Sequence, residues 1–139
     1  MITLEQAQTM IAVARDKGRE MGLKPLSVAV LDAGGHLLAF VREDGASPGR
    51  FEIAQGKAYG AVMLGMPGSA QMARAEAQSY FMAAVNGAFG GRVIPVPGGV
   101  LVMQGDAVVG AVGVTGDTSD NDAAVAVAGI AAAGFTAKA

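Results

Sequence analysis

Two pairs of short apolar segments, each pair joined by a glycine-containing turn, set the strongest limit on what this chain can fold into. The run Leu26–Leu31 (LSVAVL) is followed by DAGG and then by the apolar segment His36–Arg42. Val100–Gln104 and Val108–Val114 are likewise joined by Gly105-Asp106. Turns this short join neighbouring antiparallel strands, because parallel strands need a long crossover. The sequence therefore predicts two β-hairpins in a mostly antiparallel sheet.

The segments between and around these strands predict four helices. The first has a capping box, formed by Thr3 and Gln6, and the last follows a start signal at Ser119 and Asp122. Because the predicted strands are apolar on both faces, we expect helices on both sides of the sheet. The expected α/β fold is a three-layer α/β/α sandwich around a mostly antiparallel five-stranded sheet, in a single domain of residues 1–139. The helices are expected at 4–18 or 4–22, 48–65, 69–85 and 123–133, and the strands at 26–31, 36–42, 93–96, 100–104 and 108–114.

Composition excludes several classes of site and partner. The chain has no cysteine, so it forms neither a disulfide nor a thiolate metal site. Its net charge of -2 gives no indication of nucleic acid or an anionic membrane as a partner. The N-terminal sequence MITLEQAQ lacks the features of a secretory signal, and the most apolar run, Ala123–Phe135, is too short to span a bilayer. We therefore expect a cytoplasmic protein that binds neither nucleic acid nor membranes.

Charged residues are scarce, at 16% of the chain, against about 25% in ordinary domains. A small monomer needs charged surface, so the shortage indicates that other subunits cover part of this one. Alternatively, many of the hydrophobic residues are alanines that tolerate exposure. The composition favours a homo-oligomer.

Three polar side chains are the first candidates for a site. His36 is the only histidine, and a neutral imidazole can ligate iron or move protons near pH 7; a solvated turn residue is the simpler alternative. Arg50 and Lys57 are seven residues apart in a predicted helix, hence close to one face. These two cations either clamp a carboxylate or extend along the surface to solvent. The residues leave open which metal, if any, the chain binds.

Glycines and acidic residues allow both a structural and a ligand-binding interpretation. Four glycines lie inside predicted elements, where close packing is the favoured explanation and contact with a ligand the alternative. The clustered Asp117, Asp120 and Asp122 do not match a calcium loop and are expected to cap the last helix. The four glycines are Gly56, Gly60, Gly110 and Gly113.

Several of these motifs together resemble the GlcG/HbpS-like family. They are the hairpin VAVLDAGGHLLAF, the helix segment IAQGKAYGAV with GMPGSA after it, and VIPVPGGVLV followed by VVGAVGVTGDTSDND. The family includes haem-binding proteins and a domain attached to PduO-type corrinoid adenosyltransferases, and the resemblance covers nearly the whole chain. It implies a profilin-like α/β sandwich that forms homo-oligomers, in agreement with the fold predicted above.

The resemblance also implies a ligand site between the sheet and a helix, near the DAGGH hairpin, the Lys-bearing helix and the PGG turn. At that turn, glycine N–H groups could meet a carboxylate or propionate. The candidate catalytic residues are His36 and Lys57. The candidate binding residues are His36, Arg42, Arg50, Lys57, Gly98 and Gly99, the two arginines being added from charge and spacing.

Two functions remain open at this point. The first, implied by the resemblance, is a small-ligand binding protein for haem or a related tetrapyrrole. The alternative is an enzyme acting on a small carboxylated or carbonyl metabolite, with Lys57 or His36 as general acid and base. Lys57 could serve near neutral pH only if burial lowered its pKa.

Overall fold

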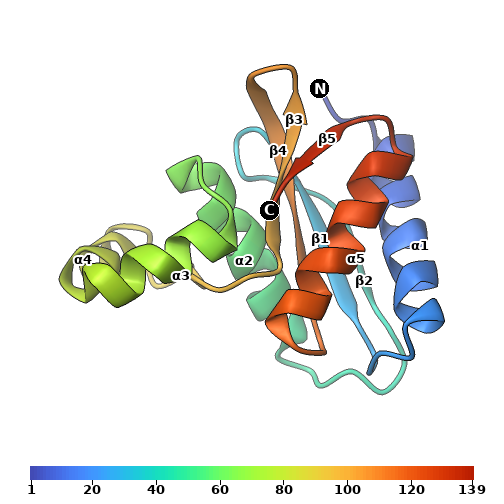
Figure 1. Ribbon diagram of the computed structural model, residues 1–139, viewed down its shortest axis with the longest axis horizontal. Helices are drawn as coiled ribbons and strands as arrows, with labels where there is room; N and C mark the ends of the chain where they lie inside the picture. Colours follow the sequence, from blue (N-terminus) through green and yellow to red (C-terminus); the bar gives the residue numbers. More distant parts are fainter.

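The computed structural model describes residues 1–139 and contains five helices and five strands (Figure 1). The strands form one sheet in the order β2-β1-β4-β3-β5, and all neighbouring strands are antiparallel. The predicted α/β fold with an antiparallel five-stranded sheet is confirmed. The strands are β1 (Ser27–Asp32), β2 (Leu37–Arg42), β3 (Gly99–Gln104), β4 (Ala107–Thr115) and β5 (Thr136–Lys138). The helices are α1 (Leu4–Glu20), α2 (Arg50–Leu64), α3 (Gly68–Ala77), α4 (Ser79–Ala88) and α5 (Ser119–Ala132).

Both predicted hairpins are present, and local turn chemistry explains them. In the β1–β2 turn, the Asp32 Oδ1 atom accepts hydrogen bonds from the N–H groups of Gly34 and His36, each at 2.9 Å. Gly35 has a φ of 81°, a conformation that glycine adopts without a steric penalty. In the β3–β4 turn, Gly105 has a φ of 60°. The first of these turns fixes the place of His36 at one end of the sheet.

The fifth strand is not the one expected. Residues 93–96 run along α2 instead of joining the sheet, and the Ile94 N–H donates to the Gly56 carbonyl at 3.3 Å. Pro95 and Pro97 lack the N–H groups that a neighbouring strand would need. The sheet is completed by β5, which pairs with β3 and was not predicted. The prediction of a strand at 93–96 was therefore wrong.

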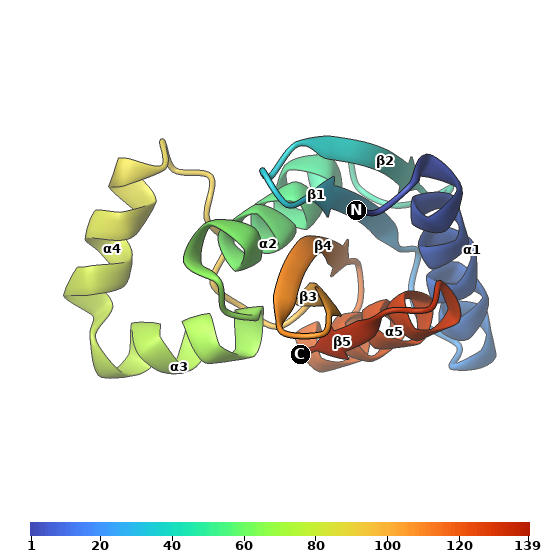
Figure 2. The same ribbon diagram turned by 90° about the horizontal axis from the view of Figure 1, so that it is seen from above.

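Helices cover both faces of the sheet, which confirms the three-layer arrangement (Figure 2). One face packs against α1 and α5, with Val28, Val112 and Ile130 in the core between them. The other face packs against α2. Gly113 lies on this second face, where a Cβ atom would collide with the Ala54 carbonyl of α2. Close packing, the interpretation favoured from the sequence, explains this strand glycine.

The first helix begins where the sequence signals predict it. The last helix begins earlier than predicted. The capping box forms as predicted, with Gln6 N–H donating to the Thr3 hydroxyl at 3.1 Å and Thr3 N–H donating to Gln6 Oε1 at 2.9 Å. The last helix begins at Ser119 with Thr118 as its cap, four residues before the predicted start at Ala123. Its first turn, Ser-Asp-Asn-Asp, is polar but already helical.

The predicted helix at 69–85 is two helices, α3 and α4, which we call the helical arm (residues 68–88). The chain breaks at Gln78, whose φ and ψ of -141° and 65° are not helical. The arm projects away from the sheet (Figure 1), while α4 packs on α3 and buries Met82 in the core cluster on the α2 side of the sheet. None of the five helices combines the length and apolar character needed to cross a membrane.

Candidate functional site

The structure divides the predicted site residues between the two ends of the sheet. In the antiparallel pair of β1 and β4, Asp32 lies opposite Gly110 and Ser27 opposite Thr115, so the β1–β2 turn and the end of β4 are at opposite ends. His36 lies at the first end. Toward the second end lie Arg42, Arg50, Lys57, Gly98 and Gly99. The resemblance led us to expect His36 and Lys57 beside one pocket. The structure instead separates them.

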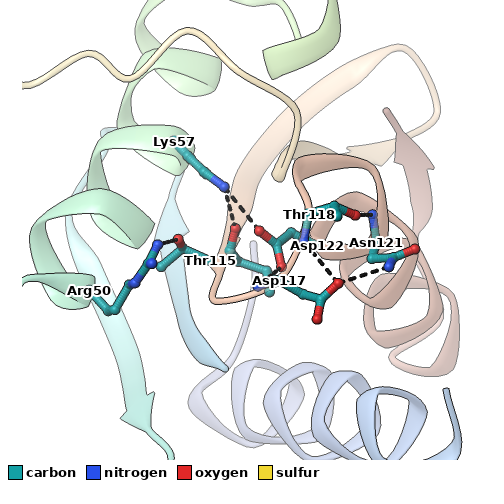
Figure 3. Close-up of polar contacts among 8 residues, drawn as sticks. Arg50, Lys57, Thr115, Asp117, Thr118, Asn121 and Asp122 are labelled. Atoms are coloured by element: carbon teal, nitrogen blue, oxygen red, sulfur yellow. Dashed lines mark hydrogen bonds and ion pairs between the residues drawn. The ribbon is translucent and has the colours of Figure 1, made fainter. Parts of the chain in front are cut away.

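Lys57 extends from α2 past the end of β4 to α5 (Figure 3). Its Nζ atom donates hydrogen bonds to the Val114 carbonyl at 3.0 Å and to Asp122 Oδ2 at 3.2 Å. The two side chains are only 4% and 1% exposed. The charge of Lys57 is therefore matched inside the chain, and the side chain does not extend to solvent.

Burial and charge pairing act against each other on this ion pair. Burial lowers the pKa of Lys57 because water no longer solvates the ammonium group, and the adjacent Asp122 carboxylate opposes this shift. Burial likewise raises the pKa of Asp122, opposed by Lys57 and by the Asp117 N–H, which donates to Asp122 Oδ1 at 3.0 Å. Each buried charge is thus sustained mainly by the other.

Sequence reasoning missed Asp122 as the partner of Lys57, because aspartates at the start of a helix usually cap it. The available signal was its spacing. Asp122 lies three, four and seven residues before Val125, Ala126 and Gly129, which form the buried face of α5. A carboxylate on a buried helical face needs a cation, and Lys57 supplies it.

Asp117, by contrast, binds the polar groups around the start of α5, as predicted for this cluster (Figure 3). It accepts hydrogen bonds from the Asn121 amide at 2.9 Å, the Lys24 N–H at 3.0 Å and the Thr118 N–H at 2.9 Å. These bonds, that from Asn121 first, lower the pKa of Asp117 to about 2. Asp120 is exposed.

Gly98 and Gly99 lie against Lys57. Gly98 has a φ of 113°, and a Cβ atom there would be 2.6 Å from the Val114 carbonyl and 2.9 Å from the Lys57 Nζ atom. The turn also lines a hollow of about 240 Å³. The charged side chain that lines this hollow is Asp120. The hollow is thus lined by an acid rather than a cation, which does not favour an anionic ligand there.

The two arginines contact no acid, and Arg50 is the one close enough to Lys57 to lower the pKa of the lysine. Arg50 donates from Nη1 to the Thr115 hydroxyl at 2.8 Å and from Nε to the Ser47 hydroxyl at 3.2 Å. Arg42 is exposed at the end of β2, opposite Ser27. Neither guanidinium forms an ion pair. Both arginines therefore keep an unpaired charge, whereas the charge of Lys57 is paired with Asp122.

His36 is presented differently, on the outside of the β1–β2 turn. Its side chain is 82% exposed, and its Nδ1 atom lies 3.3 Å from Asp32 Oδ1. The hydrogen bonds from the His36 and Gly34 N–H groups lower the pKa of Asp32, so this carboxylate stays ionised. A carboxylate at Nδ1 favours a proton on that nitrogen and leaves the Nε2 lone pair free to bind a metal.

An open apolar hollow of about 490 Å³ adjoins this histidine. Ile2, Leu38 and Val109 are among the residues that line it, together with Gly34. His36 does not itself line the hollow, but its ring lies near Gly34, which does, since a Cβ atom at Gly34 would be 2.8 Å from the imidazole. The arrangement therefore combines a free imidazole nitrogen with an apolar surface.

Comparison with known proteins agrees with the motifs of the sequence. The family described as "Haem degrading protein HbpS-like" matches residues 2–131. The chain belongs to the HbpS-like family. A double mutant of Streptomyces reticuli HbpS is 32% identical, with 93% of this chain and 84% of that chain covered and a TM-score of 0.79. No curated protein matches this chain by sequence.

Two further crystal structures share the fold. Klebsiella pneumoniae protein ORFY is 28% identical, with 95% of this chain and 90% of that chain covered and a TM-score of 0.86. PduOC, crystallised as a haem complex, is 20% identical, with 99% and 98% covered and a TM-score of 0.86. At that identity the likeness to PduOC shows the fold alone.

Proposed function

We propose that this protein binds haem or a related tetrapyrrole, with His36 as the ligand to the iron. The observation that carries the proposal is the pairing of His36 with Asp32: an exposed imidazole has its Nδ1 atom 3.3 Å from a carboxylate and its Nε2 atom free. Haem iron is commonly held by a histidine, and a carboxylate behind the imidazole strengthens it as a ligand. Membership of the HbpS-like family supports the same assignment.

The surface beside His36 fits a flat apolar ligand. Ile2, Leu38 and Val109 offer it an apolar surface, while Asp32 holds the orientation of the imidazole. When bound, haem supplies an iron centre whose chemistry depends on its axial ligand and on the polarity around it. This chain would supply the His36 imidazole as the iron ligand, with Asp32 beside its Nδ1 atom, and an apolar surface for the macrocycle.

The size of this hollow argues that a second copy of the chain completes the site. The hollow is open to solvent, with about 490 Å³ beside one face of the chain, and does not enclose a molecule of the size of haem. A haem at His36 therefore lies partly outside the chain that ligates it. A homo-oligomer, expected from the low charge content, would cover the exposed part.

The alternative function, an enzyme for a small carboxylated or carbonyl metabolite, receives less support. Its general acid and base would be Lys57 or His36. Burial does lower the pKa of Lys57, as that role requires, but its Nζ atom is enclosed and bonded to Val114 and Asp122. A substrate would have to displace the Asp122 carboxylate to reach it, so we retain haem binding as the proposed function.

Haem titration of the purified protein tests the proposal. The wild type should give a saturable Soret band, and His36→Ala should shift its maximum and weaken binding. Exogenous imidazole should restore the wild-type spectrum in His36→Ala, because it can occupy the space of the lost side chain. Arg42→Ala, at the other end of the sheet, is the control and should leave the spectrum unchanged. A His36→Ala spectrum identical to that of the wild type would disprove ligation by His36.

A further inference from the structure

A groove on the outer side of α2 lies apart from both clusters described above. It runs between α2 and the segment 91–94 and has a volume of about 330 Å³. Ile53 and Ile94 form its apolar walls, and Gly56 narrows the distance between the helix and the segment, since a Cβ atom there would be 2.5 Å from the Ile94 side chain. Neither His36 nor Lys57 lines this groove.

Tyr59 and Arg92 form one end of the groove as a fixed pair. The Arg92 guanidinium lies over the Tyr59 ring, 4.1 Å from its centroid, and its Nη2 atom donates to the Tyr59 hydroxyl at 2.6 Å. A second hydrogen bond, from Arg92 Nε to the Phe89 carbonyl at 3.1 Å, also fixes the position of the guanidinium. Tyr59 is itself only 7% exposed and packs edge-on against Phe89. The donors at this end are therefore preorganised.

This pair has hydrogen-bonding capacity that the protein does not use. A guanidinium has five N–H donors, of which Arg92 spends two, on Tyr59 and Phe89. No carboxylate pairs with Arg92. The Tyr59 hydroxyl accepts from Arg92, and its own proton has no acceptor within the chain. Two adjacent groups thus offer donors at one point, which is the arrangement that a carboxylate binds.

We propose that the groove binds a small apolar carboxylate, with the carboxylate held by Arg92 and Tyr59 and the apolar body between Ile53 and Ile94. Its volume of about 330 Å³ is at the small end of ligand sites, which range from about 300 to 1,000 Å³. A site of that size suits a monocyclic aryl carboxylate or a branched aliphatic acid. This site is independent of haem binding at His36.

Glu52 lines the opposite end of the groove and sets the direction of the ligand. It precedes Tyr59 by seven residues on α2, a rise of about 10 Å. A carboxylate is therefore attracted to the Arg92 end and repelled from the Glu52 end, and the uncharged part of the ligand lies toward Glu52.

The chain offers a clean optical probe of this groove. It has no tryptophan and two tyrosines, so Tyr80→Phe leaves Tyr59 as the only tyrosine. Tyr80 is 71% exposed on the helical arm, which makes this substitution mild. Titration of Tyr80→Phe with phenylacetate, which has about ten non-hydrogen atoms, should change the Tyr59 fluorescence saturably, with a Kd below about 1 mM.

Two variants in this background test the role of charge. Arg92→Gln should weaken phenylacetate at least about tenfold, the loss expected when a charged hydrogen bond is removed. Glu52→Gln removes the opposing charge from the same groove and should lower the Kd, the direction opposite to that of Arg92→Gln. In the parent, neutral phenylacetamide should bind more weakly than phenylacetate. In Arg92→Gln, the two compounds should bind equally well. If Arg92→Gln does not fold, Gln55→Glu, which adds an acid to the groove wall, should weaken phenylacetate instead.

His36→Ala distinguishes this site from the haem site. It should leave phenylacetate binding intact by calorimetry, whatever it does to haem. No saturable binding of phenylacetate up to 10 mM, roughly ten times the expected Kd limit, would overturn the proposal. So would an unchanged Kd in Arg92→Gln, or loss of binding in His36→Ala.

Discussion

The Nζ atom of Lys57 lies 3.2 Å from Oδ2 of Asp122, although the two residues belong to helices on opposite faces of the sheet. The contact is made past the end of β4, where Gly98 leaves room for the lysine side chain. Lys57 also donates to the Val114 carbonyl of β4 itself. One buried side chain thus links both outer layers of the sandwich to the strand between them.

Removal of one partner of this ion pair should destabilise the fold strongly. Lys57→Met leaves the Asp122 carboxylate buried without a cation, and Asp122→Leu leaves the ammonium without an anion. Each single variant should lose about 3–5 kcal/mol of unfolding free energy, measured by urea denaturation. The double variant should be more stable than either single variant, because it leaves no uncompensated charge. Losses below about 1 kcal/mol in both single variants would contradict a structural role for the pair.

Gly98→Ala should be costly for two separate reasons. Its φ of 113° strains any other residue, and the added Cβ atom would lie 2.6 Å from the Val114 carbonyl. Gly134→Ala is the matched control, because Gly134 has a φ of 91° with no atom within 4 Å of an added Cβ. Strain alone costs about 1–3 kcal/mol, so both variants should lose stability, and Gly98→Ala should lose clearly more. Equal losses in thermal unfolding would mean that the crowding at Gly98 has no energetic effect.

Acid should destabilise the wild type in part through Asp117. Its pKa falls from the ordinary 3.8 to about 2 in the folded protein, mainly through the bond from Asn121. Since the folded state then binds fewer protons than the unfolded state, this contribution is complete above pH 3.8 and is lost as the pH falls toward 2. Asp117→Asn should flatten the stability profile in that window when melting temperatures are compared with the wild type. A parallel profile for the two proteins would rule out this contribution.

Local signals predicted the hairpins and most helices because the interactions that form them are themselves local. Asp32, Gly35 and Gly105 act within a few residues of their own positions, so the turns can be read from the chain. The segment 93–96 has strand-like composition, but it bonds to α2 through Gly56 and to the side chain of Asn86. Gly56 is 38 residues from Ile94, and neither this bond nor the bond to the Asn86 side chain belongs to a pattern that distinguishes the segment from a strand. The short strand β5 has the same difficulty, since only β3 defines it.

The individual residues of the site could be predicted from the sequence. Their positions relative to one another could not. His36 and Lys57 were each identified as unusual, and each does have a specific acidic neighbour. The register of β1 against β4 then places them at opposite ends of the sheet, which no motif records. Tyr59 and Arg92 were not considered as a pair, because 33 residues separate them and no sequence pattern connects the two positions.

Asp32→Asn should test the orientation of His36 without disturbing the turn. An asparagine Oδ1 atom can still accept from the Gly34 and His36 N–H groups, so the hairpin should form. The charge behind the imidazole is lost, however, and such outer partners typically contribute about 10–100-fold to the affinity of a metal site. Haem titration should therefore show weaker binding by that order with the Soret band still present. Unchanged affinity would mean that Asp32 serves only the turn.

The last prediction concerns assembly. Helix α4 has no charged residue, and it buries only Met82 in the core of this chain, while its alanines Ala83 and Ala84 are exposed. We expect a partner copy to cover it, so sedimentation at micromolar concentration should show no dominant species of 13.8 kDa. Ala84→Glu, at an exposed position of α4, should shift the protein toward monomer because it would bury a charge in the interface. Ala12→Glu, equally exposed on α1, is the matched control and should leave the assembly unchanged. A monomeric wild type would end the proposal of a homo-oligomer, whereas an oligomeric Ala84→Glu variant would place the interface elsewhere than α4.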